Sequence, residues 1–90
     1  MKSIIHNGEN CFICGRRASE RHHIFGASNR NWSEKYGLTV NLCHWCHNEP
    51  PNGVHFNRDL DLKLKALAQK KFNEAYPEEN FVEIFGRNYL

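Results

Sequence analysis

Two short segments, CFIC at residues 11–14 and CHWC at residues 43–46, decide the fold of this chain. Each carries a Cys-x-x-Cys pair, and two such pairs can direct four thiolates at one ion. Zinc suits this donor set, because it takes four sulfur ligands in a tetrahedron at about 2.3 Å. Four cysteines leave no open position for water, so the predicted zinc is structural. Its predicted ligands are Cys11, Cys14, Cys43 and Cys46.

Other interpretations of the cysteines are disulfides, a redox pair and a covalent haem at the CHWCH run of residues 43–47. A redox Cys-x-x-Cys normally lies in a βαβ frame, which this pattern lacks, and a haem would leave Cys11 and Cys14 unexplained. The opening MKSIIHNGEN has no apolar run typical of a signal peptide, and no segment approaches the about 18 apolar residues of a membrane span. We therefore expect a cytoplasmic protein with no membrane association, in which reduced cysteines favour metal binding.

The length of 90 residues predicts a single domain over residues 1–90. So small a core often needs a metal or disulfides to hold it. Residues 1–58 carry seven Lys and Arg against four Asp and Glu, whereas residues 59–90 carry five against six. The positive excess thus lies with the cysteines and histidines, which suits a phosphate-facing site; ordinary scatter of surface charge is the other interpretation.

Periodicity and turn residues predict short elements around the cysteines and a long helix after them. We expect short strands at residues 21–25 and 38–42, a loop over residues 26–37, and a short helix that ends before the turn at residues 50–53. The long helix is predicted to start at Asn57 or Asp59 and to end at Pro77, and a short final helix is predicted over residues 78–85. The apolar stripe of the long helix, predicted as core packing, consists of Leu60, Leu64, Leu67, Ala68, Phe72, Ala75 and Tyr76.

Four of the histidines lie between or just after the cysteine pairs. His22 and His23 are adjacent, His47 follows Cys46, and His55 lies eight residues further on. Adjacent residues on a strand face opposite sides, so His22 and His23 cannot share one task. One could bind a metal while the other acts on a neighbouring water. Their joint placement indicates a functional cluster.

The order CFIC, RHHIF and LCHWCH resembles the HNH endonucleases, the ββα-metal superfamily, over about residues 11–55. The segments GLTVNLCHWCHNEPPNGVHFN and FGRNYL are similar to small phage and prophage HNH proteins and to the RecA-dependent recombination-enhancement nucleases. The resemblance implies an α+β fold. Its zinc-stapled, treble-clef-like ββα-metal core would span about residues 11–57, and a C-terminal helical extension with an amphipathic helix would span about residues 58–90. It also implies a metal-dependent DNA endonuclease, encoded by a phage or prophage.

Site roles carry over from the resemblance position by position. His22 and His47 match the ligands of the catalytic ion, and His23 matches the general base. His55 is the candidate for a further ligand, although the intervening prolines break any continuous helix. Asn41 is the asparagine nearest to the family's middle position, and either Asn41 or a backbone carbonyl would do the orienting. The resemblance implies that Mg²⁺ or Mn²⁺ supports cutting.

A histidine side chain, with an ordinary pKa of about 6.5, is suited to taking a proton from water at neutral pH. The expected partner is DNA, together with a recombinase or another phage or host DNA-processing protein. The alternative function is a non-catalytic zinc-stapled DNA-binding or interaction module derived from an HNH nuclease. The sequence does not give the oligomeric state. The basic residues predicted to contact the DNA backbone are Arg16, Arg17, Arg21, Arg30 and Lys35.

Overall fold

A two-stranded antiparallel sheet and four α-helices form the fold in a computed structural model that describes residues 2–90. This composition confirms the predicted α+β class. The two 3₁₀ turns, labelled η, precede α1 and α3. The elements are β1 (Glu20–His23), η1 (Ala27–Asn29), α1 (Arg30–Tyr36), β2 (Thr39–Leu42), α2 (His44–Asn48), η2 (Val54–Phe56), α3 (Arg58–Ala75) and α4 (Phe81–Phe85).

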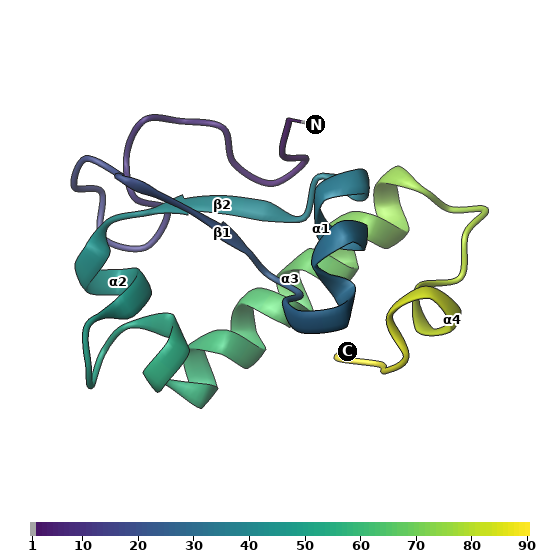
Figure 1. Cartoon of the computed structure of the whole chain (residues 1–90). Helices are drawn as coiled ribbons and strands as arrows, with labels where there is room; N and C mark the ends of the chain where they lie inside the picture. The colour runs from purple at the N-terminus through teal and green to yellow at the C-terminus, as the bar shows by residue number, and fades with distance from the viewer. Residues whose placement is uncertain (1) are drawn as a thin grey trace.

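The strand pair sets which side chains share a face. In the antiparallel register Glu20 lies opposite Leu42 and His22 lies opposite Val40. These two pairs therefore point to one face of the sheet, and the intervening residues point to the other. The chain leaves β1 into α1 and leaves β2 into α2, so the two helices lie at opposite ends of the sheet, as Figure 1 shows.

The loop predicted over residues 26–37 is wrong, because this segment forms η1 and α1. The polar residues that indicated a loop lie mainly at the ends of the helix or inside it. Asn29 occupies the N-cap, and Gly37 ends the helix with a φ of 71°, a left-handed conformation that favours glycine. Ser33 is buried, accepting a hydrogen bond from Phe25 N at 3.0 Å and donating one to Phe25 O at 2.8 Å.

The predicted long helix is confirmed as α3, with Asn57 as its N-cap. The Asn57 side chain accepts a hydrogen bond from Leu60 N at 3.1 Å. Ala75, predicted in the apolar stripe, is exposed, whereas the neighbouring Tyr76 packs against the core. The final helix begins at Phe81 rather than at residue 78, since Asn80 is its cap. Every helix within residues 2–90 is too short or too polar to cross a lipid bilayer.

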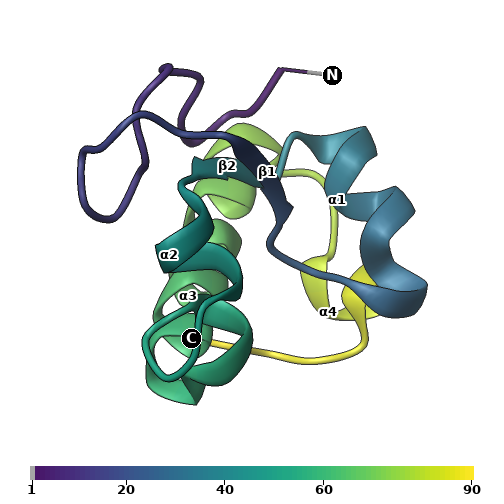
Figure 2. The same cartoon turned by 60° about the vertical axis from the view of Figure 1, so that its left-hand side comes forward.

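An aromatic core joins the helices beside the sheet. Phe72 of α3 is fully buried, and its ring centroid lies 5.1 Å from that of Tyr36 and 5.4 Å from that of Phe81. Phe25, just after β1, lies 4.8 Å from Phe85 by the same measure. In both views the strand pair lies over α3, and α4 lies to the side where α1 is found (Figures 1 and 2). This core fixes α3 beneath the strands that carry the histidines.

Candidate metal centres and active site

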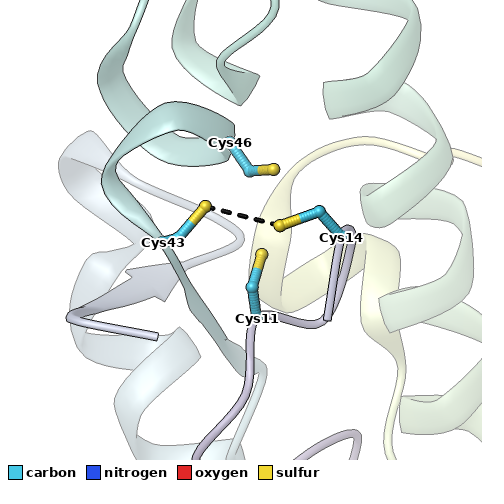
Figure 3. A group of neighbouring side chains, drawn as sticks. All are labelled: Cys11, Cys14, Cys43 and Cys46. Atoms are coloured by element: carbon cyan, nitrogen blue, oxygen red, sulfur yellow. Dashed lines mark hydrogen bonds between the residues drawn. The ribbon is translucent and has the colours of Figure 1, made fainter. Parts of the chain in front are cut away.

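The four cysteines of the two pairs meet at one point. Cys11 and Cys14 come from the N-terminal loop, Cys43 follows β2, and Cys46 lies on α2; their sulfurs point toward one another in Figure 3. All four sulfurs lie within 4.8 Å of one another, and the Cys14 and Cys43 sulfurs are 3.5 Å apart. That distance is too long for a disulfide bond of about 2.05 Å. Four sulfurs about 2.3 Å from one ion would be about 3.8 Å apart, so the cluster is compatible with a structural zinc.

The cluster creates an uneven distribution of thiol pKa values. Burial acts to raise the pKa of Cys11, but hydrogen bonds from the backbone amides of Cys14, Cys43 and Ile13 lower it to about 6. Burial raises the pKa of Cys46, and the neighbouring thiols raise it further. Four thiolates so close together repel one another, and a bound cation offsets that repulsion. The donor set therefore fits zinc chemically as well as geometrically.

A second cluster consists of three histidines from three separate elements. His22 lies on β1, His47 on α2 and His55 on η2. One ring nitrogen from each lies within 4.8 Å of the other two. His47 Nε2 is 3.2 Å from His22 Nδ1 and 3.0 Å from His55 Nε2. This is the second group of side chains in residues 2–90 whose arrangement could hold a metal ion.

A tight turn returns His55 to His47 across the two prolines. Gly53 N donates to Glu49 O at 2.7 Å. A Cβ atom at position 53 would lie 2.7 Å from Glu49 N and 3.0 Å from His47 O, so glycine alone permits this close approach. The prolines do interrupt the helix, as predicted, but the turn then places η2 beside α2. The structure thus brings His55 into the cluster.

Two histidines of this cluster are prepared to act as neutral ligands. Burial, together with the charge of the neighbouring imidazoles, lowers the pKa of His22 to about 3. His22 Nε2 is the buried side-chain nitrogen that has no hydrogen-bond partner within residues 2–90. Burial also lowers the pKa of His55. Neutral imidazole nitrogens with lone pairs are what a divalent cation requires, so the donor set fits such an ion.

A cleft of about 600 Å³ opens beside this cluster. His22, His23 and His55 line it together with three charged residues of α3, Arg58, Asp61 and Lys65. Phe56 also lines the cleft and is 56% exposed. The cleft therefore combines ligating, basic and aromatic groups, which suits a phosphate-bearing ligand.

His23 faces a carboxylate instead of the cluster. Its Nε2 lies 2.8 Å from Glu34 Oε2, and Arg21 reaches the same oxygen at 3.2 Å. A carboxylate only accepts hydrogen bonds, so in the neutral imidazole Nε2 carries the proton and Nδ1 keeps a lone pair. The hydrogen bond to His23 is the main cause that lowers the pKa of Glu34. Ser33, anchored on Phe25, fixes the helix that carries Glu34.

Other residues predicted for the site lie outside the lining of this cleft. Asn41, predicted for an orienting role, donates from Nδ2 to Gly8 O at 2.7 Å. His23 is hydrogen-bonded by the Glu34 carboxylate. Lys35 lies over the rings of Trp32 and Tyr36. The five basic residues predicted to contact DNA, none of which lines the cleft, are Arg16, Arg17, Arg21, Arg30 and Lys35.

Sequence reasoning missed several residues of the site. Glu20 contacts His47, and it could have been found by strand alternation because it lies two residues before His22. Arg58 is the first residue of α3 and Lys65 lies two turns further along it. The charge count was divided at residue 58, so it separated these two basic residues from each other. Glu34 lies in the segment wrongly predicted as a loop, so nothing in the pattern pointed to it.

Comparison of the chain with protein families, with characterised proteins and with solved structures finds no match.

Proposed function

We propose that this protein is a metal-dependent DNA endonuclease of the HNH type. The observation that carries the proposal is the convergence of three histidines, two of which, His22 and His55, line one cleft together with the carboxylate-bound His23. A binding module has no need for this combination. Hydrolysis of a phosphodiester needs both a cation site and a proton acceptor, and the combination provides them.

The ββα-metal architecture is part of the same proposal. Two antiparallel strands are followed by the short helix α2, and these elements carry His22, His47 and Cys46 of the two clusters. The cysteine cluster joins the N-terminal loop to the junction of β2 and α2, while His47 adjoins Cys46 on the same helix. A structural zinc at the cysteines would thus hold His47 in place, and precise placement is what such a site requires.

The chain's own residues divide the chemistry. His22, His47 and His55 would hold a divalent ion, which as a Lewis acid stabilises charge on the phosphate and on the departing 3′ oxygen. His23 Nδ1 takes a proton from water, the hydroxide oxygen bonds to phosphorus, and the bond from phosphorus to the 3′ oxygen breaks. Glu34 keeps the His23 proton on Nε2, so that Nδ1 remains the acceptor.

DNA is proposed to lie along the cleft beside α3. Arg58 is exposed at the start of α3 and can contact a phosphate directly. Lys65 lies 2.9 Å from Asp61, so part of its charge is already balanced. The exposed ring of Phe56 offers a face for a base. A single site of this kind cuts one strand, so double-strand cutting would need two copies or a partner.

Nicking of supercoiled plasmid tests the proposal. The zinc-loaded protein should convert supercoiled plasmid to the open circle when Mn²⁺ or Mg²⁺ is present, and a chelator of divalent ions should stop the conversion. The alternative, a non-catalytic DNA-binding module, predicts that the protein retards DNA in a gel yet leaves it intact with every divalent ion.

A further inference from the structure

Glu20, at the start of β1, contacts the central histidine of the cluster. Its Oε1 atom lies 2.6 Å from His47 Nδ1 and accepts a hydrogen bond from Asn48 Nδ2 at 2.7 Å. Its Oε2 atom lies 3.1 Å from His44 Nδ1. Glu20 and His22 share one face of the strand, so the two residues reach the cluster from the same side.

This contact decides which nitrogen of His47 carries the proton. A neutral imidazole can carry its proton on either nitrogen, and a carboxylate only accepts hydrogen bonds. Asn48 Nδ2 also lies 3.1 Å from Nδ1, but it has the nearer Glu20 Oε1 as its acceptor at 2.7 Å. In the neutral imidazole Nδ1 therefore donates to Glu20, which leaves the lone pair on Nε2. That lone pair faces His22 Nδ1 at 3.2 Å and His55 Nε2 at 3.0 Å, toward the centre of the cluster.

We propose that Glu20 is a positioning residue that fixes the tautomer and ring orientation of His47 and thereby strengthens divalent-ion binding by the three histidines. The inference rests on the proposed function and adds to it a residue outside the ligand set. Both Glu20 oxygens already have partners on α2, so Glu20 acts through His47 and not as a ligand. Loss of a residue that hydrogen-bonds a metal ligand without binding the metal typically weakens metal binding by about 10–100-fold.

Manganese binding measures the effect directly. Free Mn²⁺ is followed by electron paramagnetic resonance as it is titrated into the zinc-loaded full chain. We expect Glu20→Ala to weaken Mn²⁺ binding by about 10–100-fold. Glu20→Gln keeps an acceptor oxygen without the charge, so its affinity should lie between those of wild type and Glu20→Ala. Circular dichroism and zinc content check that each variant is folded.

Glu49 provides the matched control. Its carboxylate lies 3.1 Å from His44 Nε2, whereas no contact joins it to His47. Glu49→Ala should therefore leave the affinity for Mn²⁺ within about twofold of wild type, because tautomer control through His47 is intact. Equal losses in Glu20→Ala and Glu49→Ala would overturn the inference, since they would indicate a general effect of acidic charge near α2.

The tautomer itself is a second readout, and it needs no variant. Nitrogen NMR of the His47 side chain in the wild-type protein, before Mn²⁺ is added, should find the proton on Nδ1. A proton on Nε2 overturns the inference while leaving the nuclease proposal in place, as does wild-type affinity for Mn²⁺ in Glu20→Ala. A wild-type protein that binds no Mn²⁺ beyond its zinc overturns both.

Discussion

At the scale of single residues, strand alternation gives two adjacent histidines different surroundings. His22 is buried beside the half-buried His47 and the exposed His55, while His23 meets Glu34 of α1. The burial of His22 favours a neutral imidazole that can bind a cation. The contact of His23 with Glu34 leaves the other ring nitrogen of His23 as a proton acceptor. The proposed division between ion binding and proton transfer follows from this separation.

His55 gives the sharpest test of the cluster at this scale. His55→Ala removes one of three convergent nitrogens, so it should weaken Mn²⁺ binding at least as much as the about 10–100-fold expected for Glu20→Ala. Titration of Mn²⁺ into wild type and variant measures the change. His6→Ala is the matched control, because His6 bonds to Asn10 O and lies outside the cluster. Unchanged affinity in His55→Ala would remove this residue from the ligand set.

The sequence could predict the members of both clusters but only part of their surroundings. Cysteine spacing and histidine placement pointed to the ligands, because those residue types have few other reasons to gather. The role of His55 depended on a turn whose geometry rests on Gly53, and no periodicity encodes that turn. Glu34 became a partner of His23 through the packing of α1, which is a tertiary effect.

At the scale of elements, the long α3 and the short strands β1 and β2 were predicted, whereas the short α1 was not. The 18-residue α3 carries an apolar stripe and an Asn57 cap, and both could be recognised. The seven-residue α1 has fewer than two full turns, so its apolar residues show little helical periodicity. Its caps are Asn and Gly, which are also common in loops. Its stability comes from buried Ser33 and Tyr36, which only the folded chain reveals.

Arg58 allows a prediction about how α3 meets DNA. Arg58→Ala removes a positive charge from the cleft, so it should weaken DNA binding and lower the slope of log affinity against log salt by about 0.9 on duplex DNA. Fluorescence anisotropy at several salt concentrations measures that slope. The whole protein should itself bind DNA in a salt-sensitive way with little sequence preference, because phosphate contacts dominate.

Arg30→Ala is the matched control for this experiment. Arg30 is an exposed arginine on α1 that was predicted from the sequence to contact DNA but does not line the cleft. Its removal should change the salt slope less than the removal of Arg58. The reverse order would place DNA on the α1 side of the molecule and contradict the cleft as the binding surface.

At the scale of the whole molecule, the cysteine cluster is predicted to carry much of the folding free energy. Structural zinc contributes about 10–16 kcal/mol in small zinc domains. That equals or exceeds the about 5–15 kcal/mol by which a typical domain is stable. The 90-residue chain should therefore bind about one zinc tightly and should not stay folded without it.

Cys43→Ser tests this dependence, since it removes one of the four sulfurs. The variant should lose both its zinc and its folded circular dichroism spectrum, whereas His22→Ala should keep both because His22 belongs to the other cluster. Elemental analysis and circular dichroism are the measurements. A folded, reduced wild-type protein that contains no zinc would contradict the proposed role of the cysteines.

The central claim is that the cysteine cluster holds the zinc that stabilises the fold, while the histidine cluster cuts DNA with His23 as the acceptor of the proton from water. The most direct measurement is the plasmid nicking rate against Mn²⁺ concentration for wild type, His22→Ala, His47→Ala and His23→Ala. The account predicts that extra Mn²⁺ partly restores the first two variants, whose ion binding is weakened. It predicts that His23→Ala stays about 10²–10⁴-fold slow at every concentration, because a proton acceptor is missing. A wild-type rate in zinc-loaded, folded His23→Ala would contradict the account.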